Sequence, residues 1–203
     1  MKKLIFTLML GLAGIGAANA QLTETFDNNQ WGWTEQMTDL GKVYIVEGVL
    51  RFETHTRTDI EWEKIAENLS SHAYLPIDPK DGFTITFDAN VDKIADDKYF
   101  GIILDYTDDM NYMIFMMRRN WAYLVRIKEG KMTNLWKNMF HLPKQKKARL
   151  DVQIQYSGGD MEFRVDDVMA LKVRYAPIES NGFGFFAFGN TKVDFDNVEI
   201  KPY

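Results

Sequence analysis

The sequence predicts an all-β protein built as a two-sheet antiparallel sandwich. Apolar and polar residues alternate with a period of two through most of the chain after residue 41, as they do in half-buried strands. Short turn sequences rich in Gly, Asn and Asp separate these runs. Aromatic residues make up 14% of the chain, and such large side chains fill the space between two packed sheets.

Residues 1–20 are predicted to be an export signal. Lys2 and Lys3 form a positively charged start, residues 4–15 an apolar segment, and Ala18-Asn19-Ala20 a small-x-small cleavage site. A membrane anchor is the competing interpretation, but the apolar segment is shorter than the roughly 20 residues that a span requires. We therefore expect an exported protein, periplasmic or extracellular, that begins at Gln21. It should form one domain over residues 21–203 and have no membrane span after signal cleavage.

Composition excludes several classes of function. Removal of the two signal lysines takes the formal charge from −5 to −7, and an acidic chain is poorly suited to nucleic acid. The one basic cluster, at residues 144–149, is typical of a solvated loop. The chain has no cysteine, which excludes disulfides, thiolate catalysis, Cys-ligated zinc and a lipid anchor on cysteine.

The first half of the mature chain gives three clear strand signals. Residues 42–53 read as a hairpin around Glu47-Gly48, and residues 83–89 alternate cleanly, with one face toward water. Residues 99–106 are almost wholly apolar, which indicates a central strand covered on both faces. Residues 60–70 differ, because their apolar positions fall near helical spacing. They predict either a short helix or an irregular excursion.

The following strands are joined by tight turns. We expect strands at residues 112–117, 121–128, 132–136, 150–156, 161–165 and 168–173, with turns at Arg119-Asn120, Glu129-Gly130, Gly158-Gly159 and Asp166-Asp167. In the first of these strands, alternation places Met113 and Met117 on one face and Met116 on the other, where flexible thioethers fill core gaps.

The last two strands, residues 182–189 and 193–200, meet at an Asn190-Thr191 turn. In the final strand Val193 and Phe195 have one parity, whereas Val198 and Ile200 have the other. A β-bulge near Asp196-Asn197 would put all four side chains on the same face, and we predict that bulge.

This succession of strands resembles a known superfamily. The resemblance is carried by residues 99–112 (YFGIILDYTDDMNY), residues 121–130 (WAYLVRIKEG), the hairpin at 161–168 and the closing VDFDNV at 193–198. They resemble the concanavalin A-like lectin/glucanase superfamily, in particular its laminin-G-like and family-16-like jelly rolls in secreted Bacteroidetes proteins. The resemblance implies a jelly-roll sandwich, a fold that hosts lectins, glycanases and adhesion modules alike.

The sequence gives little sign of catalysis. The Glu-x-Asp-x-x-Glu strand of family-16 glucanases is absent, and the nearest carboxylate pair is Glu61 and Glu63 on either side of Trp62. No serine lies in a Gly-x-Ser-x-Gly turn, and the three histidines lack metal-ligand spacing. We therefore expect no catalytic residue.

Candidate binding residues are aromatic side chains with polar neighbours. Sugar rings pack an apolar face on an aromatic ring while amide, carboxylate and guanidinium groups read the hydroxyls. On this basis we expect ligand-binding roles for Trp121, Arg118, Trp62 and Tyr112, on the concave sheet or the loop rim. Other aromatic residues are expected in the core: Trp31 and Trp33 at one end of the sandwich, and Tyr123 and Trp136 between the sheets.

No organic cofactor is expected, but a structural calcium ion is a further expectation. Calcium prefers several hard oxygen ligands. Asp27 would lie beside Asp194 and Asp196 if the first and last strands pair, as they do in many jelly rolls. A second acidic candidate is the turn that contains Asp105, Asp108, Asp109 and Asn111.

These observations favour a secreted, non-catalytic module that binds a glycan or a cell-surface partner. A jelly-roll glycoside hydrolase or lyase is the first alternative, and it requires paired carboxylates in a groove. A structural subunit for envelope assembly is the second, and it requires a broad exposed apolar patch.

Overall fold

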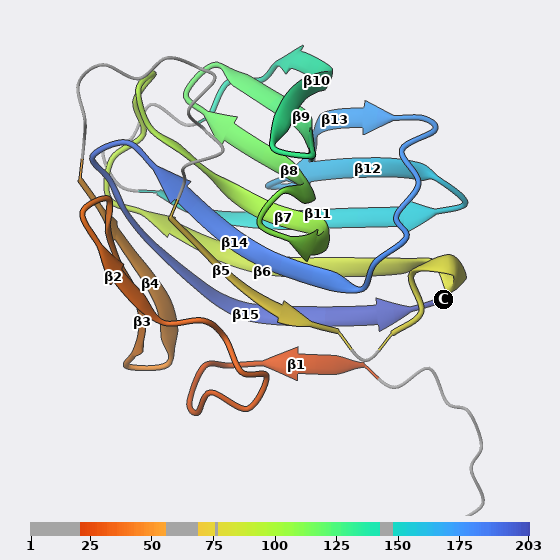
Figure 1. The fold of residues 1–203 in the computed structure, drawn as a ribbon. Helices are drawn as coiled ribbons and strands as arrows, with labels where there is room; N and C mark the ends of the chain where they lie inside the picture. Colours follow the sequence, from red (N-terminus) through yellow and green to blue (C-terminus); the bar gives the residue numbers. More distant parts are fainter. Residues whose placement is uncertain (1–20, 56–68, 76, 143–147) are drawn as a thin grey trace, which may run out of the picture.

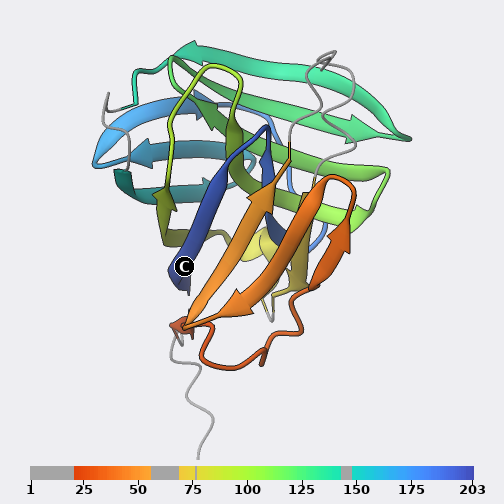
Figure 2. The ribbon, with the colours of Figure 1, turned by 90° about the vertical axis from the view of Figure 1, so that its left-hand side faces the viewer.

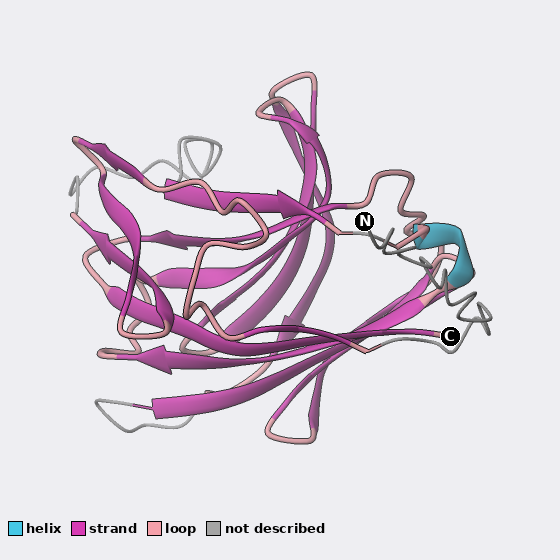
Figure 3. Ribbon diagram, turned by 90° about the horizontal axis from the view of Figure 1, so that it is seen from below, coloured by secondary structure: helices cyan, strands magenta, loops and turns pink. Residues whose placement is uncertain are grey.

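The computed structural model describes residues 21–55, 69–75, 77–142 and 148–203. In this part of the chain two antiparallel sheets pack face to face, which confirms the predicted two-sheet sandwich (Figure 1). Figure 3 shows that strands dominate and that a short helical turn, Pro79–Asp81, lies close to the C-terminus. There the Tyr203 N–H donates to the Gly82 carbonyl oxygen. No described helix is long and apolar enough to cross a membrane.

One sheet has nine strands within the described residues. They are β1 (Leu22–Glu24), β2 (Gln36–Thr38), β3 (Gly41–Val46), β4 (Val49–Thr54), β6 (Phe83–Val91), β11 (Ala148–Ser157), β12 (Asp160–Val165), β13 (Val168–Val173) and β15 (Lys192–Pro202). Their order is β13-β12-β11-β6-β15-β4-β3-β2, and β1 pairs with β15, so the first and last strands are neighbours as expected. The strands β4, β3 and β2 form one edge of this sheet, and Figure 2 views the molecule from that edge.

The other sheet has six strands in the described residues. They are β5 (Leu69–Tyr74), β7 (Tyr99–Asp108), β8 (Asn111–Arg118), β9 (Trp121–Lys128), β10 (Lys131–Met139) and β14 (Gly182–Phe188). Their order is β10-β9-β8-β7-β14-β5. The segment predicted as a short helix or an excursion ends in β5 from Leu69 onward, and residues 60–68 lie outside the described residues.

Four of the predicted turns form two-residue hairpins with positive φ at both central positions. This is the geometry that matches the twist of antiparallel strands. The pairs are Glu47-Gly48, Glu129-Gly130, Gly158-Gly159 and Asp166-Asp167. The predicted hairpins are therefore confirmed.

The predicted bulge in the last strand is also present. Pairing between β15 and β6 shifts register between Asp196 and Glu199, and Asn197 has a φ of 52°. Its side-chain Nδ2 donates to Asp88 Oδ2 at 2.6 Å. Beyond the bulge, Val198 and Ile200 face the interior together with Val193 and Phe195.

A cluster of aromatic rings joins the two sheets. Phe185 of β14 is fully buried and stacks on Phe195 of β15, with ring centroids 4.2 Å apart. It also contacts Phe87 of β6 at 5.0 Å and Trp33 at 5.6 Å. A single side chain of the six-stranded sheet is thus packed against two strands of the other sheet and the loop before β2.

The six-stranded sheet is buried on its outer face as well, the face turned away from the nine-stranded sheet. Met113 and Met117 of β8 point into the interior, whereas Met116 belongs to a second apolar cluster on the outer face. The predicted alternation of these methionines is confirmed, and so is the burial of residues 99–106 on both faces.

We predict that Phe185→Ala lowers the free energy of unfolding by about 3–5 kcal/mol, because a buried ring is replaced by a cavity. Urea denaturation followed by tryptophan fluorescence measures this loss. The control is Tyr175→Ala, whose side chain is 90% exposed and whose loss should stay within about 0.5 kcal/mol. If Phe185→Ala fails to fold, Phe185→Leu should show a smaller loss in the same direction. Equal stability of Phe185→Leu and Tyr175→Ala would contradict the packing of Phe185 between the two sheets.

A second prediction concerns the bulge. Asn197→Ala and Asn197→Gly both lose the bond to Asp88, but only alanine carries a Cβ into the left-handed region. Asn197→Ala should therefore be less stable than Asn197→Gly by about 1 kcal/mol. The same denaturation experiment compares them, and a more stable alanine variant would exclude the left-handed geometry.

Candidate functional site

The predicted ligand-binding residues lie at two ends of β8. Arg118 and Trp121 are register partners across the β8–β9 hairpin. Tyr112 is six residues away from Arg118 along β8, which corresponds to about 20 Å. Trp62, with its flanking glutamates, lies outside the described residues. The structure therefore brings Arg118 and Trp121 together and separates both from Tyr112.

Most of the polar groups at the Trp121 end are already engaged with the protein, although the buried Arg118 Nε has no hydrogen-bond partner within the described structure. The Arg118 guanidinium donates to Tyr99 Oη at 3.0 Å and lies over the rings of Tyr99 and Tyr123. Lys137 Nζ is 3.9 Å from the centroid of the Trp121 ring. The cations available to a ligand here therefore make cation–π contacts within the chain.

Two aromatic expectations are wrong at this end of the sheet. Tyr123 is buried, but on the outer face of the six-stranded sheet and not between the sheets. Trp136 of the edge strand β10 is 47% exposed. The pairing of β10 with β9 shifts register between Asn134 and Trp136, and β10 is the edge strand of its sheet, so Trp136 keeps one side toward solvent. Trp33 is in the core as expected, and Trp31 packs against it half-buried.

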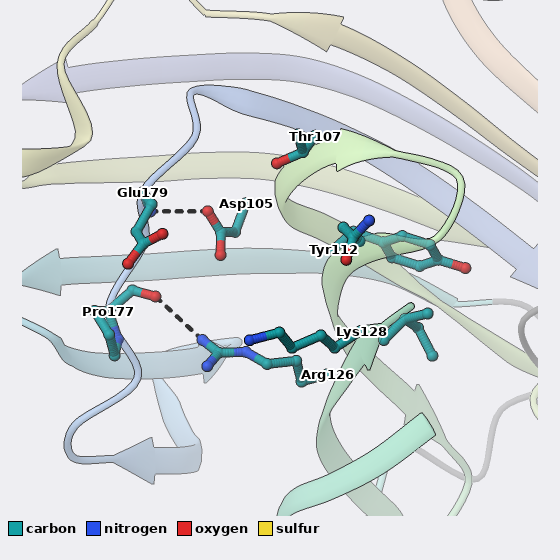
Figure 4. A pocket seen from close by; sticks show the side chains of 9 residues that line it. Asp105, Thr107, Tyr112, Arg126, Lys128, Pro177 and Glu179 are labelled. Carbon is teal, nitrogen blue, oxygen red and sulfur yellow. Dashed lines mark hydrogen bonds between the residues drawn. The ribbon is translucent and has the colours of Figure 1, made fainter. Parts of the chain in front are cut away.

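At the Tyr112 end there is a pocket of about 290 Å³ (Figure 4). It lies where β7 and β9 end and β8 begins, beside the loop of residues 174–181. We call it the Asp105 pocket, and its lining includes Tyr112 and the polar side chains of Asp105, Asn111, Arg126, Lys128 and Glu179.

Asp105 is placed by a bulge in β7. Its φ is 54°, and both neighbouring strands shift register at this point. The carboxylate Oδ1 accepts the backbone N–H groups of Glu179 and Ser180, both at 2.8 Å, and so ties the loop to the sheet. Burial raises the pKa of the Asp105 carboxyl above its ordinary value, although the two N–H groups and Arg126 act in the opposite direction.

Two cations come from the end of β9. Figure 4 shows Arg126 and Lys128 extending side by side toward the loop, with Asp105 and Glu179 across from them. Arg126 Nη2 donates to the Pro177 carbonyl oxygen at 3.2 Å. Among the described residues, none of these four charged groups takes part in an ion pair. The pocket therefore holds two cations and two acidic groups whose charges are not neutralised by a direct partner.

The sequence predicts part of this pocket. Tyr112 was expected to bind ligand, and Asp105 and Asn111 were named as calcium candidates. Arg126, Lys128 and Glu179 were missed. The sequence signal was available for two of them, since Arg126 and Lys128 are charged residues at the end of an otherwise apolar strand.

The three predicted calcium ligands lie near the β1–β15 pair. Asp194 is engaged by Arg51, whose Nε and Nη2 donate to its two oxygens at 2.7 and 2.9 Å. The pKa of Asp196 is raised by burial, and Asp27 adds to this shift as a nearby like charge. No group of three His, Cys, Asp or Glu residues within the described ranges is arranged to hold a metal ion. Calcium binding by Asp27, Asp194 and Asp196 stays a prediction.

Comparison with known proteins yields similar folds only. No family model matches the sequence, and neither does any curated protein. Similar solved structures include the carbohydrate-binding module CBM66 from Bacillus subtilis, with 12% identity, a TM-score of 0.61 and coverage of 84% of this chain and 95% of that one. A mutant of the GH43 protein BlXynB from Bacillus licheniformis has 16% identity and a TM-score of 0.64, and the match covers 89% of this chain but 39% of that one.

A third similar structure is a protein of unknown function with a galectin-like fold from Bacillus subtilis. It has 9% identity, a TM-score of 0.60 and coverage of 89% and 94% of the two chains. At these identities the likeness shows the fold alone. The similar structures are of β-sandwich and jelly-roll types, which agrees with the predicted fold class, whereas membership of the concanavalin A-like superfamily stays a prediction.

We predict that Asp105→Asn changes how stability depends on pH. Folding raises the pKa of Asp105, which means that the folded state favours the protonated carboxyl. The contribution of this group to the free energy of unfolding is therefore complete below about pH 4 and is lost as pH rises through the raised pKa. Asparagine keeps the Oδ1 acceptor for the loop but does not titrate. The stability of the variant relative to the wild type should therefore increase with pH in urea denaturation. A stability difference between variant and wild type that stays the same at every pH would refute the raised pKa of Asp105.

Proposed function

We propose that this chain is a non-catalytic carbohydrate-binding module and that the Asp105 pocket is its sugar-binding site. The observation that carries the proposal is the lining of the pocket, where Asp105, Glu179, Asn111, Arg126 and Lys128 bring hydrogen-bonding groups of both kinds together. Sugar hydroxyls donate and accept hydrogen bonds at once. Carboxylates, the Asn111 amide and the two cations of β9 match that requirement.

The charge balance of the pocket favours a neutral sugar over an ionic one. Arg126 and Lys128 oppose Asp105 and Glu179, so an anionic or cationic ligand would meet a like charge as well as an opposite one. Charged donors and acceptors make stronger hydrogen bonds than neutral ones. A neutral ligand rich in hydroxyl groups can use all four groups without this repulsion.

The similar structures support the sugar-binding proposal without testing it. One of them is named as a carbohydrate-binding module, and another has a galectin-like fold. The concanavalin A-like resemblance, export to the periplasm or the cell exterior, and a glycan or cell-surface partner belong to the same proposal. Residues 1–20, on which export depends, lie outside the described residues.

A glycoside hydrolase is the second candidate, because the Asp105 pocket contains two carboxyl groups and the pKa of one of them is raised. A general acid needs such a raised pKa. Against this role, Asp105 Oδ1 already accepts two backbone N–H groups and fixes the loop. Release of reducing sugar by the wild type, abolished in both Asp105→Asn and Glu179→Gln, would establish the hydrolase instead.

The binding site is tested by a glycan array followed by calorimetry on the sugars that bind. Lys128→Ala and Glu179→Ala remove exposed groups, and each should weaken binding about tenfold, which corresponds to about 1.4 kcal/mol. Lys201→Ala, exposed on the other sheet, is the matched control and should bind as the wild type does.

Trp121→Ala distinguishes the two ends of the sheet. Because the Arg118 guanidinium and Lys137 Nζ near Trp121 lie over aromatic rings of the protein, this variant should keep wild-type affinity. Loss of binding in Trp121→Ala but not in Lys128→Ala would move the site to the Trp121 end. Silence of the wild type across the whole array would reject the sugar-binding proposal, and light scattering would then test the envelope-subunit alternative through self-association.

A further inference from the structure

A second hollow of about 370 Å³ adjoins the outer face of the six-stranded sheet. Its lining includes Gln36, His72, Ile103, Tyr106, Asp109 and Tyr112. Tyr112 also lines the Asp105 pocket, so this residue is a wall common to both. Neither Trp121 nor Arg118 contributes to it.

Glycines of β14 make room for this hollow. Gly184 pairs with His72 of β5 on one side and with Ile103 of β7 on the other, and Gly182 pairs with Tyr106. Because these glycines carry no side chain, rings from the two flanking strands meet above β14. The rings of His72 and Tyr106 stack with centroids 4.0 Å apart and an interplanar angle of 27°. A Cβ on Gly184 would collide with the carbonyl oxygen of Ser71.

The hollow also contains a polar atom that lacks a partner. His72 Nδ1 is buried and makes no hydrogen bond within the described structure. An unpaired buried nitrogen costs free energy that a ligand hydroxyl would recover. Burial lowers the pKa of His72, with Asp109 as the opposing charge, so the ring is neutral near pH 7 and can accept a hydrogen bond. Tyr106 donates its hydroxyl to Asp109 Oδ1 at 2.8 Å, which fixes the second ring in place.

We propose that this hollow is a second sugar subsite, continuous with the Asp105 pocket at Tyr112, so that the protein binds an oligosaccharide in preference to a single sugar. This inference rests on the proposed function. The rings of Tyr106 and Tyr112 are 7% and 6% exposed and lie 6.2 Å apart, so the wall between the two hollows is aromatic. One sugar unit contacts the groups of the Asp105 pocket, and the next unit packs against the His72–Tyr106 pair and bonds to His72 Nδ1.

The test is calorimetry with mono-, di- and tetrasaccharides of the glucose, xylose, galactose and mannose series. In the series that binds, the tetrasaccharide should bind at least about tenfold more tightly than the monosaccharide. His72→Ala should remove this gain and leave monosaccharide affinity unchanged, whereas Lys128→Ala should weaken both. Lys201→Ala is again the control, because Lys201 is exposed on the other sheet and lines neither hollow.

A second measurement uses only the wild-type protein, so its result does not depend on whether a variant folds. In methyl NMR spectra of the wild type, the Ile103 signal should move on addition of the tetrasaccharide but not of the monosaccharide, since Ile103 lines the second hollow alone. Equal affinity for both lengths, with a stationary Ile103 signal, would overturn the second subsite and leave the proposed function intact. Absence of binding at every length would overturn both.

Discussion

The packing of Phe185 between the sheets is the contact on which the rest of the structure depends. Its ring stacks on Phe195 and touches Phe87 and Trp33, so one side chain of β14 fixes the distance between the sheets and the position of the loop before β2. The chain has no disulfide to do this. Burial of aromatic surface must therefore supply most of the stability, and it does so at the centre of the sandwich.

The same strand connects the core to the proposed site. β14 has the sequence Gly-Phe-Gly-Phe-Phe-Ala-Phe, in which Phe183 and Phe185 point inward while Gly182 and Gly184 face outward. Period-two alternation thus produces a dense aromatic interior on one face and a vacant strip on the other. The rings of His72 and Tyr106 occupy that strip from the two neighbouring strands, so the second hollow is a consequence of how β14 packs.

The sequence predicted the fold better than the site because the two depend on contacts of different range. Strands, hairpins and even the bulge at Asn197 are encoded by neighbouring residues, through alternation and turn composition. The Asp105 pocket requires Asp105 to meet the backbone of Glu179 and Ser180, more than 70 residues later in the chain. The spacing of residues along the sequence contains no information about this long-range contact. Tyr112 was found because an aromatic residue with polar neighbours is a local signal, whereas Glu179 gave none.

Charge pairing explains why the proposed site is at this end and not on the polar face of the other sheet. On the nine-stranded sheet the charged side chains bind one another: Arg51 pairs with Asp194, Arg149 with Asp88, and Lys172 with Glu162. A sugar there would have to compete with bonds already made, and the gain would be small. In the Asp105 pocket, Lys128 and Glu179 make no such pair within the described structure, and Arg126 donates to a carbonyl oxygen and a thioether sulfur. Charged side chains that form no ion pair in the folded protein keep the capacity to form hydrogen bonds with a ligand.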